Sequence, residues 1–159
     1  MLLRLLTPLV LLHSFSESFV YEIQTMMKCV TDRNAYIYNG YGCYCGIGGA
    51  GTPIDGIDAC CQAHDKCYDQ GSASKLCPSA PFEYIPGYHW NCDNGSTQCN
   101  TDSFADSTTC GEYLCHCDKN LVDCWSQYPV PDYVQKCTNQ TTFQKVEDDV
   151  ENFFDILFR

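Results

Sequence analysis

Fourteen cysteines constrain the fold of this 159-residue chain more than any other feature of its sequence. Their number is even, and their density is typical of secreted domains that are held together by disulfide bridges. Cysteine and histidine at short spacing also occur in zinc sites, and the C-C-x-x-H run at residues 60–64 has such a spacing. The secretory signal pattern at residues 1–18 favours disulfides over zinc.

Residues 1–18 have the pattern of a signal peptide. The apolar run Leu2–Leu12 carries Arg4 near its start, and small residues at Ser16 and Ser18 mark a cleavage position. The run is about half as long as the roughly twenty apolar residues that a membrane-spanning helix needs. We therefore expect a secreted, extracellular protein without a transmembrane segment.

The charge balance restricts the partners of the chain. Nine basic and twenty acidic residues give a formal net charge of −11. A chain with this charge is repelled by nucleic-acid phosphates and by anionic membranes. Nucleic-acid binding is therefore excluded as an expected function, and most of the acidic residues need no role beyond keeping a secreted protein soluble.

The stretch from Tyr41 to Tyr68 combines a glycine-rich loop with a helical pattern. Its glycines can turn backbone oxygens towards a bound cation, and they stand at Gly42, Gly46, Gly48, Gly49 and Gly51. Beyond Gly56 the cysteines and His64 recur at steps of three and four residues, which predicts a helix. Asp55 and Asp58 are expected to cap this helix at its start.

An amphipathic helix is expected at residues 19–29. Val20, Ile23 and Met27 lie on one stripe of this segment. Such a stripe faces either the core of the protein or a lipid surface, and the sequence leaves both alternatives open.

A small β-hairpin is expected at residues 88–100. Asn94-Gly95 lies at its middle and is the strongest short hairpin signal. The preceding segment, residues 69–87, is rich in glycine, serine and proline, and it is expected to be a loop.

A second long helix is expected at residues 112–126, which contain neither glycine nor proline. Each long helix has two cysteines that are seven residues, or about two turns, apart: Cys60 and Cys67 in the first, Cys117 and Cys124 in the second. If the helices run antiparallel and these cysteines bridge them, Asp118 lies about 3 Å along the axis from His64. A carboxylate beside an imidazole is an arrangement that orients a catalytic histidine.

Three motifs together carry a family resemblance: Y-G-C-Y-C-G-I-G-G at residues 41–49, C-C-Q-A-H-D-K-C-Y at residues 60–68 and C-H-C-D at residues 115–118. They resemble the secreted, calcium-dependent phospholipases A2, most closely the pancreatic-like (group I-like) branch. The resemblance covers Phe19–Cys137. It implies hydrolysis of the sn-2 acyl ester of glycerophospholipids at the surface of phospholipid aggregates.

The resemblance also implies a fold and a metal site. The fold would be mainly α and disulfide-rich, with two long antiparallel helices, an N-terminal amphipathic helix, a calcium-binding loop and a small β-hairpin wing. One catalytic Ca²⁺ would be bound by the backbone carbonyls of Tyr44, Gly46 and Gly48 and by the carboxylate of Asp65. Such a set of ligands suits a cation that prefers roughly six to eight oxygens.

Five residues would carry the chemistry if the resemblance holds. His64 would act as general base on a water, and Asp118 would orient its ring. The backbone amide of Gly46 would help to stabilise the oxyanion. Tyr68 and Tyr88 would donate hydrogen bonds to Asp118. No serine nucleophile is needed.

The bridges of the family, transferred to this chain, would be Cys29–Cys92, Cys43–Cys137, Cys45–Cys61, Cys60–Cys124, Cys67–Cys117, Cys77–Cys110 and Cys99–Cys115. Glu22 stands where the family usually has glutamine, and residues 138–159 form an acidic extension outside the resemblance. The sequons at Asn94 and Asn139 could carry glycans, and the second is the better acceptor because the first lies in a tight turn.

The alternative is a secreted binding or toxin-like protein that keeps the scaffold without catalysis. Such proteins typically change the Asp65 position or the calcium loop, and both are intact here. The sequence does not indicate the oligomeric state or the preferred head group.

Overall fold

The structure is a computed structural model that describes residues 21–46, 49–78, 88–100 and 109–138. The expected signal peptide, residues 139–159 of the acidic extension and Gly48 lie outside these ranges. None of the helices in the described ranges combines the length and the apolarity that crossing a bilayer requires.

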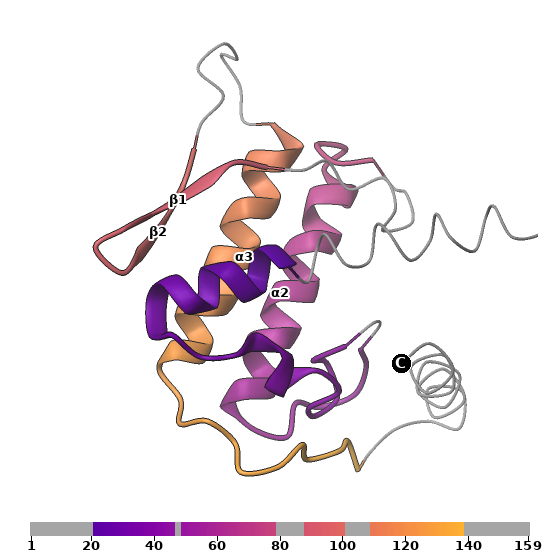
Figure 1. Ribbon diagram of the computed structural model, residues 1–159. Coiled ribbons are helices and arrows are strands. Elements are labelled where there is room, and N and C mark those ends of the chain that lie inside the picture. The colour runs from indigo at the N-terminus through magenta and orange to yellow at the C-terminus, as the bar shows by residue number, and fades with distance from the viewer. Residues whose placement is uncertain (1–20, 47–48, 79–87, 101–108, 139–159) are drawn as a thin grey trace, which may run out of the picture.

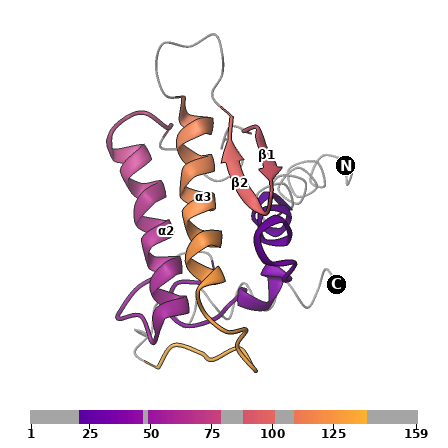
Figure 2. The ribbon, with the colours of Figure 1, turned by 90° about the vertical axis from the view of Figure 1, so that its left-hand side faces the viewer.

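Two long helices, α2 (Gly56–Ala73) and α3 (Cys110–Ser126), lie side by side (Figures 1 and 2). The side chain of Asp55 accepts a hydrogen bond at the start of α2, as expected, and Thr109 does the same for α3. Cys60 near the start of α2 is bridged to Cys124 near the end of α3, and Cys67, two turns further along α2, is bridged to Cys117, two turns earlier on α3. The helices are therefore antiparallel, and their register is covalently fixed.

Helix α2 is longer than the sequence indicates. Residues 69–73 were expected in a loop, but they complete α2. Gly71 is accommodated because the ring of Tyr113 packs against it, so that an added Cβ would lie 2.9 Å from that ring. Tyr113 also donates a hydrogen bond to the carbonyl of Cys67 at 3.0 Å. A contact between the helices therefore outweighs the low helix propensity of glycine.

All seven predicted disulfide bridges are confirmed. Every cysteine of the chain lies in the described ranges and none is free. The zinc alternative for the cysteines is thereby excluded, since no thiolate is left to bind a metal.

The hairpin consists of β1 (Trp90–Asp93) and β2 (Ser96–Cys99), paired antiparallel. Asn94 and Gly95 connect the strands with φ angles of 49° and 77°, and positive φ at both residues is the signature of a type I′ turn. Bridges from β1 to the N-terminal helix and from β2 to α3 fasten the hairpin at the side of α3 (Figure 2).

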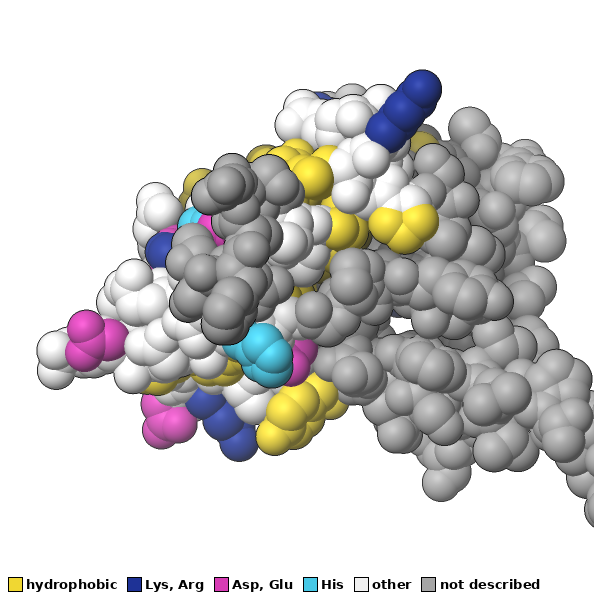
Figure 3. All heavy atoms as spheres, turned by 90° about the horizontal axis from the view of Figure 1, so that it is seen from above, with side chains coloured by type: hydrophobic (Ala, Val, Ile, Leu, Met, Phe, Trp, Pro, Cys, Tyr) yellow, Lys and Arg dark blue, Asp and Glu magenta, His cyan; other side chains and the backbone are white. Residues whose placement is uncertain are grey.

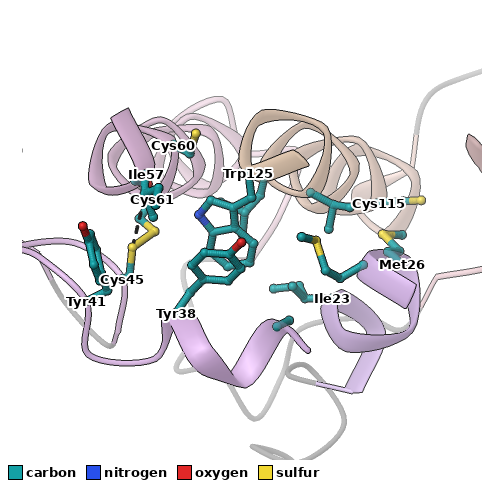
Figure 4. Close-up of a cluster of buried hydrophobic side chains, with 14 residues drawn as sticks. Ile23, Met26, Tyr38, Tyr41, Cys45, Ile57, Cys60, Cys61, Cys115 and Trp125 are labelled. Atoms are coloured by element: carbon teal, nitrogen blue, oxygen red, sulfur yellow. Dashed lines mark hydrogen bonds between the residues drawn. A yellow bond between two sulfur atoms is a disulfide. The ribbon is translucent and has the colours of Figure 1, made fainter. Parts of the chain in front are cut away.

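The core forms where the N-terminal helix, residues 21–31, meets η1 (Ala35–Tyr38) and the long helices. Ile23, Met26 and Met27 are buried there, so the apolar stripe of the N-terminal helix faces the core. Tyr38 stacks on Trp125 of α3 with 4.2 Å between the ring centroids (Figure 4). This cluster packs the N-terminal helix and η1 against α3.

The carboxylate of Asp58 organises the glycine-rich loop. It is fully buried and accepts hydrogen bonds from the backbone N–H groups of Cys43, Tyr44 and Ile54 at 2.8 to 2.9 Å. The expectation that Asp58 is simply a helix cap was therefore wrong, because it binds loop amides up to fifteen residues away. Gly42 packs directly against this carboxylate.

We expect Gly42→Ala to lower the free energy of unfolding by about 3 kcal/mol, the upper range for single substitutions. An added Cβ would lie 2.2 Å from the carboxyl carbon of Asp58, and the φ of Gly42 is +64°. Gly95→Ala is the matched control, because its φ is +77° but its Cβ would meet nothing closer than 3.8 Å. Denaturant unfolding of both variants measures the difference, and equal losses would contradict the role of Asp58.

Candidate active site

The carboxylate of Asp118 lies at the centre of the site, and its side chain is 0% exposed. Its Oδ1 accepts hydrogen bonds from His64 Nε2 at 2.7 Å and from the hydroxyl of Tyr68 at 2.9 Å. The hydroxyl of Tyr88 donates to Oδ2. The structure therefore brings together four predicted site residues from three segments of the chain.

Helical geometry and disulfides explain this convergence. His64 and Tyr68 are one turn apart on α2, so they share one face, and their ring centroids are 4.6 Å apart. Asp118 follows Cys117, which is bridged to Cys67 on the same stretch of α2. The bridge therefore fixes the position of Asp118 along the axis of α2, at the level of His64.

Asp118 determines which nitrogen of His64 is the base. A carboxylate accepts hydrogen bonds, so Nε2 carries the proton and Nδ1 is the basic nitrogen of the neutral ring. Nδ1 lies 3.9 Å from Oδ1 of Asp65, and the side chain of His64 is 10% exposed. The basic nitrogen is therefore on the side of the expected metal ligand.

Both tyrosines remain hydrogen-bond donors at physiological pH. Burial raises the pKa of the Tyr68 and Tyr88 hydroxyls well above their usual range, and the negative charge of Asp118 raises it further. Each hydroxyl therefore keeps its proton and holds Asp118 in place.

Asp65 lies next to His64 on α2 and points in a different direction, since successive helical residues diverge by about 100°. Its side chain is 33% exposed. Burial raises the pKa of its carboxyl to about 7, with His64 acting in the opposite direction and Asp69 and Asp58 adding to the rise. The ionised carboxylate is therefore disfavoured here unless a cation compensates its charge.

The loop backbone closes on this carboxylate at Gly49. A Cβ at this position would lie 2.9 Å from Oδ2 of Asp65 and 2.4 Å from the ring of Tyr44. Only glycine permits such a close approach without a shift of the loop. The hydroxyl of Tyr44 donates to the carbonyl of Gly51 at 2.8 Å, which ties the two sides of the loop together.

Comparison with known proteins decides the family. A family model described as phospholipase A2 matches residues 20–143. The chain belongs to the phospholipase A2 family. The similar proteins include basic phospholipase A2 nigroxin A of Micrurus nigrocinctus, which is 37% identical over 110 residues, 69% of this chain and 86% of that protein.

Mammalian relatives give the same result. The phospholipases A2 of Bos taurus and Ovis aries are each 35% identical to this chain over 113 residues. The match covers 69% of this chain in both cases, with 75% of the bovine protein and 89% of the ovine one. The predicted family and the mainly helical, disulfide-rich fold are confirmed, and the protein is a phospholipase A2.

The residues of this phospholipase A2 fit a calcium ion. Ca²⁺ prefers oxygen ligands, and the site offers the undercompensated carboxylate of Asp65 beside a loop whose backbone closes on it. Within the described ranges no three His, Cys, Asp or Glu side chains gather around a common point. Backbone carbonyls, including those of Tyr44 and Gly46, would therefore have to supply most of the ligands.

One contact differs from what the resemblance implies. The N–H of Gly46 donates to the carbonyl of Tyr44 at 2.9 Å. That carbonyl keeps a second lone pair for a cation. The amide of Gly46, by contrast, is already engaged, so a role at the oxyanion requires this bond to open.

Sequence reasoning missed one contributor to the site. The carboxylate of Asp58 holds the backbone of the glycine-rich loop, and its separation from Cys43 and Tyr44 in the sequence hid this role. Glu22, which the sequence marked as a departure from the usual glutamine, accepts a hydrogen bond from Nε1 of Trp90 at 2.6 Å.

Proposed function

We propose that this phospholipase A2 is secreted, requires calcium and hydrolyses the sn-2 acyl ester of glycerophospholipids at the surface of phospholipid aggregates. The products are a lysophospholipid and a free fatty acid. The observation that carries the proposal is the His64 imidazole, whose Nε2 is bonded to the buried carboxylate of Asp118 at 2.7 Å. The pairing of all fourteen cysteines in bridges supports secretion after removal of residues 1–18.

The chain's own groups suffice for the proton transfers. Nδ1 of His64 takes a proton from the water that attacks the ester carbonyl, and Asp118 stabilises the imidazolium that forms. The imidazolium then gives its proton to the departing alcohol oxygen. Tyr68 and Tyr88 hold the carboxylate of Asp118 throughout, so the ring does not rotate between the two transfers.

The calcium ion would be held by Asp65 and by the carbonyls of Tyr44, Gly46 and Gly48. When bound, it supplies a Lewis acid for the ester carbonyl and a positive charge for the substrate phosphate. Asp65 adjoins His64 on α2, so the helix fixes the position of the metal ligand relative to the base.

The position of hydrolysis tests this function. Vesicles of phosphatidylcholine with different acyl chains at sn-1 and sn-2 are incubated with the protein and calcium, and the released fatty acids are identified. We expect the sn-2 fatty acid alone. Release of the sn-1 chain, or of a phosphorylated head group, would overturn the assignment.

The acidic extension is expected to be dispensable for the chemical step. Truncation after Cys137 should leave the hydrolysis of dispersed monomeric phosphatidylcholine unchanged, because His64, Asp65 and Asp118 all precede it. Comparison of the truncated and full-length proteins on this substrate measures the effect. Loss of hydrolysis would show that the extension contributes to the site.

The charge of the chain also predicts no preference for anionic vesicles. The net charge is −11, and the face shown in Figure 3 carries both basic and acidic side chains. Activity on phosphatidylcholine vesicles should at least equal that on phosphatidylglycerol vesicles in the same assay. A strong preference for phosphatidylglycerol would refute the charge argument.

A further inference from the structure

Exposed apolar side chains gather on residues 127–137, a segment that follows α3 and that we call the strap. In Figure 1 the strap runs from the end of α3 along the lower edge of the molecule. The described ranges expose seven large hydrophobic side chains, and four of them lie within seven consecutive residues of the strap. Single exposed hydrophobic residues are normal, but a group of them marks a contact site. The four are Tyr128, Val130, Tyr133 and Val134, with exposed fractions of 36% to 71%.

The backbone of the strap is fixed to the domain. Nη1 of Arg33 donates a hydrogen bond to the carbonyl of Tyr128 at 2.7 Å. The N–H of Gly42 donates to the carbonyl of Gln135 at 2.6 Å, and a disulfide holds the strap at Cys137. The apolar side chains are therefore presented by an ordered backbone. A partner that packs on them has little conformational entropy of the strap to overcome.

Two prolines restrict the kind of partner that the strap can take. Pro129 and Pro131 have no backbone N–H, so a β-strand added along the strap would find no donor at either position. A helix satisfies its backbone hydrogen bonds internally and packs through its side chains alone. The strap is therefore better suited to an amphipathic helix than to a strand.

The acidic extension of the same chain contains such a sequence. Residues 139–159 lie outside the described ranges, and they begin two residues after Cys137. Within them, apolar residues recur at steps of three and four, with acidic residues between them. An isolated helix shorter than about 12 to 15 residues is marginal in water, so this segment needs a surface to pack on. The apolar positions are Val146, Val150, Phe153, Phe154, Leu157 and Phe158.

We propose that residues 146–158 dock as an amphipathic helix on the strap of the same molecule. Residues 138–145 are the tether, with a reach of at most about 27 Å when fully extended. A flexible tether this short gives an effective concentration in about the millimolar range, which exceeds the concentration of a second copy in dilute solution. The acidic face of the helix stays in water, where Lys136 at the end of the strap is exposed. The inference concerns a surface outside the active site and does not depend on the proposed function.

The first test measures how far the extension covers Tyr133 in the full chain. Tyr133 is 71% exposed on the strap, and Tyr21 is 60% exposed on the N-terminal helix and serves as internal reference. Tyrosine nitration by tetranitromethane, assigned by mass spectrometry, should be about fivefold slower at Tyr133 in wild type than in Phe153→Ser/Leu157→Ser, as for a docked form populated to about 80%. Nitration of Tyr21 should be the same in both proteins.

The matched control is Asn152→Ser, because Asn152 lies opposite the apolar stripe of the expected helix. This variant should protect Tyr133 as well as wild type does. Equal nitration of Tyr133 in wild type and in Phe153→Ser/Leu157→Ser would overturn the proposal, and so would protection of Tyr21 in place of Tyr133.

The reciprocal test changes the strap and measures amide hydrogen exchange of the extension. Val130→Ser/Val134→Ser removes exposed apolar side chains, and the amides of residues 146–158 should then exchange about fivefold faster than in wild type, as docked and free forms of a segment differ in protection. Asp132→Asn, at an exposed polar residue of the strap, should leave this exchange unchanged. Thermal unfolding of both variants checks that the domain itself is intact.

Docking within one molecule is independent of protein concentration and of lipid. Protection that appears only as the protein forms dimers would assign the surface to a second copy and would contradict the proposal. Protection that appears only when phosphatidylcholine vesicles are added would contradict it as well. Both tests are carried out without substrate, so a failure of the proposed function would leave their outcome unaffected.

Discussion

Replacement of His64 by glutamine is expected to lower kcat for phosphatidylcholine about a thousandfold, within the range typical of general-base catalysis. Glutamine can still accept or donate a hydrogen bond, but it cannot take a proton from water at neutral pH. Calcium affinity should stay nearly unchanged, because the expected ligands are Asp65 and backbone carbonyls. Steady-state hydrolysis and calcium titration of the same variant measure the two effects.

His116→Gln is the matched control for this variant. His116 is exposed on α3, one residue before Cys117, and it takes no part in the site. Its replacement should leave kcat unchanged. The assignment of proton transfer to His64 and of calcium binding to other groups would be contradicted if His64→Gln lost calcium affinity and activity to the same extent. Wild-type turnover by His64→Gln would contradict it as well.

Replacement of Asp65 by asparagine is expected to lower calcium affinity by at least about a hundredfold, because the only carboxylate of the proposed set of ligands is lost. Hydrolysis should be lost with it. The fold should survive, since seven bridges rather than the ion hold the helices and the loop. Calcium titration, hydrolysis and thermal unfolding check these three expectations.

The stability of this variant gives a second readout. Burial raises the pKa of the Asp65 carboxyl to about 7, so in wild type the folded state loses stability as the pH rises from about 4 to about 7 and this group ionises. Without calcium at pH 8, Asp65→Asn should therefore be no less stable than wild type. Asp69→Asn, at an exposed neighbour, is the control and should retain hydrolysis. Wild-type turnover by Asp65→Asn would contradict the assignment of Asp65 as a calcium ligand.

The arrangement of the long helices could be predicted because it follows from local rules. Helical periodicity located α2 and α3, and the equal seven-residue spacing of their cysteines is compatible with an antiparallel pair of helices joined by two bridges, which the structure shows. In that register Asp118 is expected near His64, as it is found. The hairpin followed from Asn94-Gly95, whose positive φ angles few other residue pairs adopt easily.

The remaining features depend on contacts between distant segments. The last turn of α2 forms although it contains Gly71, because Tyr113 of α3 packs on it. Asp58 has the sequence context of a cap, but its carboxylate is occupied by loop amides. The bond between the amide of Gly46 and the carbonyl of Tyr44 is a detail of loop geometry that no spacing rule contains.

The most direct test of the central claim is a calcium titration of wild-type hydrolysis on phosphatidylcholine vesicles, with binding of calcium measured in parallel. The account predicts that hydrolysis is absent in excess chelator and rises with the occupancy of a single site. Turnover that persists in the chelator, or that rises without bound calcium, would contradict it.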